Sequence, residues 1–227
     1  MTHPVTHIFR LLRWGRVLAR HGALRGLERD RNTPPPVRRL LRLARFGTAL
    51  PAMPDYAGAF QAVGPAAIKL GQTLATRPDL VGEQAARNLL SLQDSLPPVA
   101  FALIEAEIAA SFGKPISSLF VSIDPIAVGS ASVAQVHKAV TTDGRTVAVK
   151  VLRPGIRERF ARDIATYEWA AAQLESFGGE AARLRPRAVI ANFKRWTLRE
   201  LDLRREAASA SELADAMASF AKFRVPA

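Results

Sequence analysis

A single lysine on a predicted strand is the first sign of chemistry in this sequence. Residues 146–151 alternate so that three valines share one face of the strand, and Lys150 lies on the other face with Ala148 and Leu152. A cation on a rigid strand can be aimed at the phosphates of a nucleotide, whose negative charge it neutralises. The alternative is an edge-strand lysine that faces water, and these residues alone leave both interpretations open.

A stretch of mostly small residues precedes this strand, at the place where a phosphate-covering loop would lie. It consists of Gly129, Ser130, Ala131, Ser132, Val133, Ala134 and Gln135. Small residues let a backbone approach phosphate, although the β-carbons at Ala131 and Ala134 narrow the allowed conformations compared with glycine. With Val147-Ala148-Val149-Lys150, the stretch fits the loop and strand lysine of protein kinases without matching G-x-G-x-x-G. A small-residue strand packed under a helix is the other interpretation.

The composition excludes several other kinds of chemistry. The chain has no cysteine, which rules out thiolate nucleophiles, disulfides, iron–sulfur clusters and cysteine-ligated zinc. Its four histidines are not spaced like metal ligands, so we predict no metal site. The 227 residues, 48% of them hydrophobic, are enough for a packed core. The net charge of +12 favours an anionic partner: a membrane surface, phosphates or nucleic acid.

Most of the positive charge lies in residues 1–50, which hold eleven arginines and two acidic residues. Two amphipathic helices are predicted here, on either side of Pro34-Pro35-Pro36, each with arginines on one side and apolar residues on the other. The arginines are Arg10, Arg13, Arg16 and Arg20 in the first helix, and Arg38, Arg39, Arg42 and Arg45 in the second. The helices either dock on a core or lie on an anionic membrane. Nucleic acid is a weaker candidate, because the few aromatic residues form no stacking platform.

The rest of the chain predicts an α+β fold. Helices are expected over 56–76, 82–94, 99–112, 155–177, 185–197 and 204–222. Asp55 is suited to cap the first of these, and Gly113 to end the third. Strands over 119–123, 132–140 and 145–152 would form a small antiparallel sheet, with Asp143-Gly144 in a hairpin turn. No apolar run is long enough for a transmembrane helix.

Four motifs, in order along the chain, resemble those of the UbiB family, atypical protein-kinase-like proteins linked to ubiquinone (coenzyme Q) biosynthesis. The matching segments are Lys69-Leu70-Gly71-Gln72 for the K-x-G-Q signature, residues 131–137 for the alanine-rich loop, Val147-Ala148-Val149-Lys150 for the phosphate lysine, and Glu200-Leu201-Asp202 with Glu206 for E-x-D and the helix glutamate. The resemblance implies basic amphipathic helices over 1–50, a helical K-x-G-Q extension over 51–117 and a kinase-like N-lobe over 118–227.

The resemblance also assigns roles to individual residues. Lys150 would bind the phosphates of ATP or ADP and pair with Glu206, while residues 129–135 would cover the nucleotide. The extension would fold over the mouth of the cleft. The residues expected to meet there are Lys69, Gly71 and Gln72 on the extension, and Glu200 and Asp202 facing it.

The implied partners extend beyond the nucleotide. They are an anionic membrane surface and, in the quinone pathway, other biosynthetic proteins or lipid-quinone intermediates. The implied location is peripheral, on the cytoplasmic face of a bacterial inner membrane, or on the mitochondrial inner membrane in a eukaryote. Nucleic acid is not an expected partner.

The sequence departs from the family pattern in two ways. Gly129 stands where the family loop usually has alanine, which relaxes the loop toward that of an ordinary kinase. The residues after Lys150 contain no histidine, no H-x-D-x-x-x-x-N-like run and no Asp-Phe-Gly, which would supply the catalytic aspartate and the ligands for Mg²⁺ in the complete family protein. We therefore interpret the chain as an N-terminal portion without a C-lobe, which does not turn over ATP alone.

The predicted function is an ATP-binding kinase-like module that supports ubiquinone biosynthesis as an atypical kinase or ATPase at a membrane surface. The first alternative is a non-catalytic remnant that binds a membrane or a partner as an adaptor. The second is a nucleic-acid binder, which only the charge favours.

Overall fold

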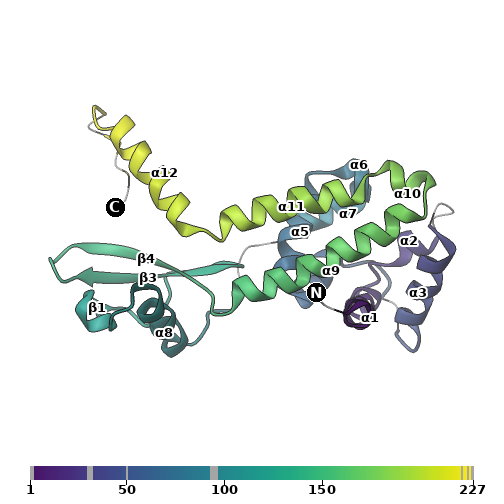
Figure 1. Cartoon of the computed structure of the whole chain (residues 1–227), viewed down its shortest axis with the longest axis horizontal. Helices are drawn as coiled ribbons and strands as arrows, with labels where there is room; N and C mark the ends of the chain where they lie inside the picture. The colour runs from purple at the N-terminus through teal and green to yellow at the C-terminus, as the bar shows by residue number, and fades with distance from the viewer. Residues whose placement is uncertain are drawn as a thin grey trace. The chain divides into compact units, whose positions relative to one another are not determined.

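The computed structural model describes residues 3–29, 33–49, 51–92, 97–220, 222–223 and 225 (Figure 1). The chain divides into two compact units, each built from two separate segments. The first unit comprises Met1–Gln93 and Glu158–Arg195, and the second comprises Asp94–Arg157 and Trp196–Ala227. The predicted division into residues 1–50, 51–117 and 118–227 rests on motifs, whereas these two units rest on packing. The three-part division therefore stays a prediction.

Helices form the first unit. They are α1 (Pro4–Arg20), α2 (Arg25–Arg29), α3 (Pro35–Arg45), α4 (Tyr56–Val63), α5 (Pro65–Ala75), α6 (Pro78–Val81), α7 (Glu83–Leu89), α10 (Gly179–Arg183) and most of α9 (Ile156–Ser176) and α11 (Pro186–Glu200). Several begin with proline in the first turn, where the missing N–H costs no helical hydrogen bond. Both predicted N-terminal helices are present, and the first, predicted over residues 7–20, begins three residues earlier, at Pro4.

The single helix predicted over 56–76 is in fact two helices. Gly64 has a φ of 128°, a conformation that favours glycine, and Pro65 follows it as the first residue of α5. Proline is tolerated in the first turn of a new helix but not in a helix interior, so the prediction of one helix was wrong. Asp55 caps α4 as predicted, since its Oδ1 accepts a hydrogen bond from Gly58 N at 2.8 Å.

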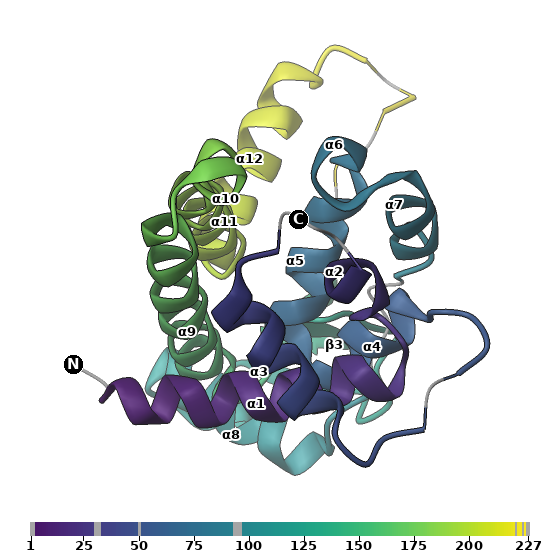
Figure 2. The same ribbon diagram turned by 90° about the vertical axis from the view of Figure 1, so that its right-hand side faces the viewer.

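Trp14 anchors α1 in the core of the first unit. Its side chain packs with Val63 of α4, and its ring centroid lies 5.2 Å from that of Tyr167 on α9. A second cluster joins Ala19 of α1 to Leu41 of α3. Figure 2 shows α1 running alongside α3 and α4. The two basic helices are thus docked on a core, as the first of the two sequence interpretations proposed.

The second unit contains a four-stranded antiparallel sheet. Its strands are β1 (Phe120–Ile123), β2 (Gly129–Ser130), β3 (Ala134–Thr141) and β4 (Thr146–Leu152). The central strand is β3, which pairs with the other three, and Val136 lies opposite Lys150 in the β3–β4 register. The hairpin turn falls where predicted, with Gly144 at a φ of 83°. Short β2 was not predicted, because two residues carry no readable alternation.

One face of this sheet is covered by α8 (Phe101–Phe112). Ile104 and Ile108 of α8 pack against Val151, with Val149 beside them. Because side chains alternate along a strand, Lys150 belongs to the opposite face. The helix ends at Gly113, whose φ of 64° gives the left-handed C-cap that the sequence predicted.

The unit also includes η1 (Ile116–Ser118) and α12 (Leu203–Ala216), which is shorter than the predicted helix over 204–222. The predicted α+β fold, with helices and a small antiparallel sheet, is confirmed. Within the described part of the chain, no helix combines the length and the apolar character needed to cross a membrane.

Candidate nucleotide-binding site

Lys150 and Glu206 form an ion pair within the second unit. The Lys150 Nζ lies 2.7 Å from Oε1 and 2.8 Å from Oε2 of Glu206, which sits in the first turn of α12. The predicted approach of these two groups is confirmed. Their side chains are 41% and 58% exposed, so water screens the pair. Its contribution to stability is therefore that of a surface pair, about 0–1 kcal/mol, rather than that of a buried one.

Lys150 lines a pocket of about 450 Å³. Residues of α8, β4 and the start of α12 line it, and its charged members are Glu107, Lys150, Arg157, Asp202 and Arg204. Three of these five carry positive charge, but Lys150 is paired with Glu206 and Arg204 with Asp202, so the net charge at the pocket is small. The Arg204 Nε donates to Asp202 Oδ1 at 2.8 Å, and this hydrogen bond lowers the pKa of the Asp202 carboxyl. Asp202 therefore stays ionised near neutral pH.

The stretch predicted to cover a nucleotide connects β2 to β3 through a tight turn. Gly129 and Ser130 form β2, and the Ala131 N donates to the carbonyl oxygen three residues later at 2.8 Å. The residues that follow are at most 5% exposed: Ser132, Val133 and Ala134. A β-carbon added to Gly129 would meet no atom within 4 Å. The accessible part of the stretch is thus its beginning, Gly129 to Ala131.

Gln135, also predicted to bind nucleotide, lies on the face of β3 that packs toward α8. Its side chain is 1% exposed; Oε1 accepts from Val99 N at 2.9 Å, and Nε2 lies 2.8 Å from His137 Nε2. The His137 Nδ1 lies 2.7 Å from the carbonyl oxygen of Asp124. A carbonyl only accepts, so we assign the proton to Nδ1, and Nε2 then accepts from the Gln135 amide. The Gln135 side chain is committed to this buried network, and its nucleotide contact stays a prediction.

Arg153 is a site residue that sequence reasoning missed. Its Nε donates to the carbonyl oxygen of Ala131 at 2.9 Å, and its Nη2 donates to Ser130 Oγ at 2.8 Å. Both Nη atoms also lie 3.0 Å from the carbonyl oxygen of Pro97. Burial lowers the pKa of Arg153, but a guanidinium remains charged in a protein. Arg153 thus links the loop to the end of β4. The only sequence signal for this role was its position three residues after Lys150.

The K-x-G-Q motif lies on α5 in the first unit, and its glycine has a packing role. A β-carbon on Gly71 would lie 2.4 Å from Leu92 Cδ1 and 2.8 Å from Phe60 Cδ1. A larger residue would therefore force these side chains to move. Gln72 Nε2 donates to the carbonyl oxygen of Leu92 at 3.5 Å, and Lys69 is half-buried one turn earlier.

The two acidic residues of E-x-D lie in the second unit. Glu200 is the last residue of α11, and Asp202 immediately precedes α12. The predicted approach of Lys69 and Gln72 to these residues stays a prediction, since it joins one unit to the other. Among the residues that the structure describes, no three histidine or acidic side chains are gathered closely enough to hold a metal ion.

The fold and the lysine–glutamate pair are those of a kinase-like N-lobe, and comparisons with known proteins identify the family. Residues 91–227 match the ABC1 atypical kinase-like domain. The chain is also 43% identical over 155 residues to a Marinobacter nauticus protein named "Probable protein kinase UbiB". The domain match spans more than half of the chain, which therefore belongs to the UbiB family of atypical kinase-like proteins.

A solved structure shares the fold. It is a Mycobacterium tuberculosis protein in complex with erythromycin, with a TM-score of 0.51 and 31% sequence identity. The match covers 72% of this chain and 41% of that chain, and the match to the Marinobacter protein covers 68% of this chain and 28% of the relative. The chain thus spans less than half of the length of each of these proteins.

Proposed function

We propose that this chain forms the ATP- or ADP-binding part of an atypical kinase or ATPase that supports ubiquinone biosynthesis. The observation that carries the proposal is the Lys150–Glu206 pair, 2.7 Å apart, with Lys150 lining a pocket of about 450 Å³. In kinase-like proteins an ammonium on this strand neutralises nucleotide phosphates, and a helix glutamate holds the ammonium in place. The pathway follows from membership of the UbiB family, and the pathway's proteins or lipid-quinone intermediates are the corresponding partners.

Lys150 and the loop that begins at Gly129 belong to the same unit and fit a nucleotide, although no residue of that loop lines the pocket itself. A bound nucleotide supplies the phosphoryl group that such proteins transfer or hydrolyse. Lys150 would hold phosphate oxygens, and the two hydrogen bonds from Glu206 would fix its direction. Arg153 would keep the beginning of the loop in place, so that the backbone at Gly129 is free to approach phosphate. The described residues gather no carboxylate set for the Mg²⁺ of the complete family protein, so no Mg²⁺ ligand is assigned here.

The test is a calorimetric titration of the chain with ATP and with ADP. Lys150→Met should weaken binding at least tenfold, because a hydrogen bond to a charged group contributes about 1.5–3 kcal/mol and about 1.4 kcal/mol corresponds to tenfold. Lys194→Met is the matched control. Lys194 pairs with Glu168 at 2.8 Å and is 43% exposed, much like Lys150, but it lies in the first unit.

The Lys194→Met control distinguishes a specific nucleotide site at Lys150 from a general effect of positive charge on affinity. Unchanged affinity in Lys194→Met, with a tenfold loss in Lys150→Met, supports the proposal. Equal affinities of the two variants would contradict it, because Lys150 would then act only as one more positive charge.

We also propose that the protein is peripheral on an anionic membrane, on the cytoplasmic face of a bacterial inner membrane or on the mitochondrial inner membrane of a eukaryote. The support comes from α3 and its end. Leu41 is buried, but Arg39 and Arg42 are exposed, and Leu43 and Phe46 are 60% and 80% exposed. A mixture of exposed basic and large apolar side chains suits the membrane interface.

Vesicle co-sedimentation tests the membrane proposal. The double variant Arg39→Gln/Arg42→Gln should bind phosphatidylglycerol-containing vesicles at least tenfold more weakly, since each arginine near the surface contributes about 1 kcal/mol. Arg87→Gln/Arg145→Gln removes the same charge from exposed positions outside α3 and should bind as the parent chain does. Equal losses in both variants would contradict attachment through α3. Deleting residues 1–50 is unsuitable, because Trp14 and Leu41 belong to the core.

A further inference from the structure

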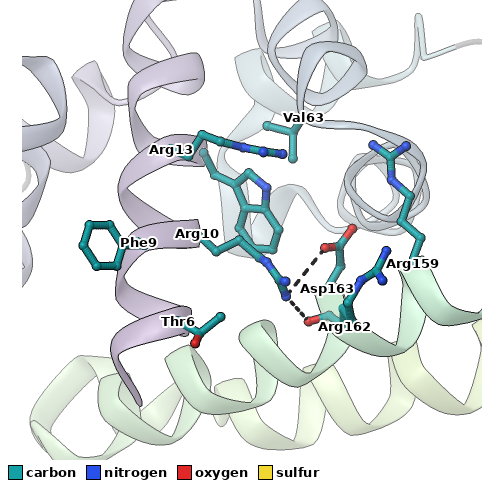
Figure 3. Close-up of a pocket in the computed structure, with 9 residues that line it drawn as sticks. Thr6, Phe9, Arg10, Arg13, Val63, Arg159, Arg162 and Asp163 are labelled. Atoms are coloured by element: carbon teal, nitrogen blue, oxygen red, sulfur yellow. Dashed lines mark hydrogen bonds and ion pairs between the residues drawn. The ribbon is translucent and has the colours of Figure 1, made fainter. Parts of the chain in front are cut away.

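A cationic pocket lies in the first unit, between α1 and α9. It has a volume of about 600 Å³, and four arginines and one acid line it: Arg10, Arg13, Arg159, Arg162 and Asp163. Figure 3 shows Arg10 and Arg13 of α1 and Arg159 and Arg162 of α9 around one opening. The opening therefore carries four guanidinium groups against one carboxylate.

Arg10 and Asp163 are the fixed part of this pocket. The Arg10 Nη1 donates to the carbonyl oxygen of Arg162 at 2.6 Å and to Thr166 Oγ1 at 3.0 Å, and it lies 4.0 Å from Asp163 Oδ1. The side chains of Arg10 and Asp163 are only 22% and 15% exposed. Burial raises the pKa of the Asp163 carboxyl, although the surrounding arginines oppose this shift. The acid is thus already engaged with Arg10, and it adds at most one negative charge.

The other three arginines have no such partner. Within the described residues, Arg13, Arg159 and Arg162 form no ion pair and their side chains donate no hydrogen bond. Other arginines of the first unit do find acids: Arg45 lies 3.0 Å from Glu28, and similar pairs occur on α6 and α7. Asp163 attracts all four arginines, but one carboxylate cannot balance four guanidinium groups, so an anion among them gains a favourable field.

The backbone next to Arg159 adds to this field. A β-carbon on Gly64 would lie 2.3 Å from Arg159 Nη2, so the guanidinium lies directly over a residue that has no side chain. Gly64 is the N-cap of α5, and no side chain caps that helix end. The N-terminal end of a helix carries partial positive charge, which here adds to that of Arg159. The first turn of α5 contains no acidic residue, so a bound anion would add the negative charge that this helix end favours.

We propose that this pocket binds a phosphate-bearing anion, held mainly by Arg13, Arg159 and Arg162. Guanidinium groups suit phosphate, because their planar forks donate paired hydrogen bonds to its oxygens. The group is either a free phosphate or diphosphate compound or the headgroup of a lipid. None of its residues lines the proposed nucleotide pocket, whose residues belong to the second unit.

The test uses the full chain and inorganic pyrophosphate as the probe, measured by calorimetry at 0.15 M NaCl, where long-range attraction is screened. Arg13→Gln/Arg159→Gln should weaken binding at least tenfold. Arg16→Gln/Arg20→Gln removes the same charge from exposed positions on α1 that do not line the pocket, and should change the affinity less than threefold. Thermal melts should show that both double variants are folded before they are heated. Arg162→Gln serves as a second pocket variant.

A second arm separates the two sources of phosphate. If pyrophosphate does not bind, phosphatidylcholine vesicles containing phosphatidate replace it, and a tenfold loss confined to the pocket variants supports a lipid headgroup. Pyrophosphate binding that the pocket variants lose supports a free phosphate compound. The proposal is overturned if both double variants lose affinity equally with either probe, if neither probe binds, or if pyrophosphate binding is lost only in Lys150→Ala.

Discussion

The two faces of the β3–β4 hairpin are used in opposite ways. On one face, Gln135 and His137 are at most 1% exposed and hydrogen-bonded to each other and to backbone groups. On the other face, Lys150 lies opposite Val136, is 41% exposed and pairs with Glu206. Neighbouring positions along the same strands thus separate a dry polar network from a solvated charge.

This difference separates stability from binding. A buried polar group that loses its partner costs about 1–3 kcal/mol of folding free energy, whereas an exposed ion pair contributes about 0–1 kcal/mol. Substitutions on the buried face should therefore lower the free energy of unfolding of the second unit. Substitutions on the open face should change what it binds and leave its stability nearly unchanged.

The largest effect is expected from Gln135→Leu. The change leaves Val99 N and His137 Nε2 without their partner, and we expect the free energy of unfolding to fall by about 2–4 kcal/mol. Urea denaturation followed by circular dichroism measures this loss. Lys138→Leu is the control, because Lys138 is exposed on the same strand, and it should change stability by less than about 0.5 kcal/mol. Similar losses of unfolding free energy in both variants would contradict the proposed difference in stability between the two faces.

An intermediate effect is expected from Arg153→Ala, because Arg153 belongs to neither face. Its hydrogen bonds to Ala131, Ser130 and Pro97 are partly exposed, so their loss should cost about 1–3 kcal/mol of stability. The freed loop should also weaken ATP binding severalfold at concentrations where the variant is folded. Arg153→Lys, which keeps the charge but not the planar fork, should recover little. A stability loss with unchanged ATP affinity would show that the loop does not contact the nucleotide.

Local signals made much of the second unit predictable from sequence. The Asp143-Gly144 turn, the alternation around Lys150 and the Gly113 cap are each determined within a few residues. The Lys150–Glu206 pair was also predicted, but only because the family resemblance linked positions that are distant in sequence. Gln135 shows the limit of that approach. A motif is read as a continuous stretch, whereas a strand sends every second side chain to the opposite face.

The arginine pocket was less predictable. The helical period placed Arg10 with the other arginines of its helix, on the side away from the apolar residues, yet its side chain is 22% exposed and bonded to α9. Only the packing of α1 on α9 brings Arg13 to Arg159. The sequence signal was weak: an arginine pair spaced by three residues in each helix, Arg10 with Arg13 and Arg159 with Arg162, which places both members on one side of a helix.

The smallest effect concerns the ion pair itself, and a double-mutant cycle measures it. Lys150→Met, Glu206→Gln and the double variant should give a coupling energy of about 0.2–1 kcal/mol, the range of exposed pairs. The matched cycle uses Lys194→Met and Glu168→Gln, since that pair has a distance of 2.8 Å and side chains 43% exposed. The two coupling energies should agree within error and fall in high salt, because both pairs face water.

The cycle is informative because Lys150 should contribute little to stability, as the coupling energy measures, but much to ATP affinity. If the pair is only a surface ion pair, its coupling equals that of Lys194–Glu168, and the loss of ATP affinity in Lys150→Met reflects phosphate contact rather than unfolding. Glu206→Gln should then lower ATP affinity by a few-fold, because the amide no longer fixes the ammonium. A coupling above about 2 kcal/mol would mean that the pair is desolvated like a buried one. The Lys150–Glu206 pair would then stabilise the fold as well as bind phosphate. Stability and binding would in that case not be divided between the two faces of the hairpin.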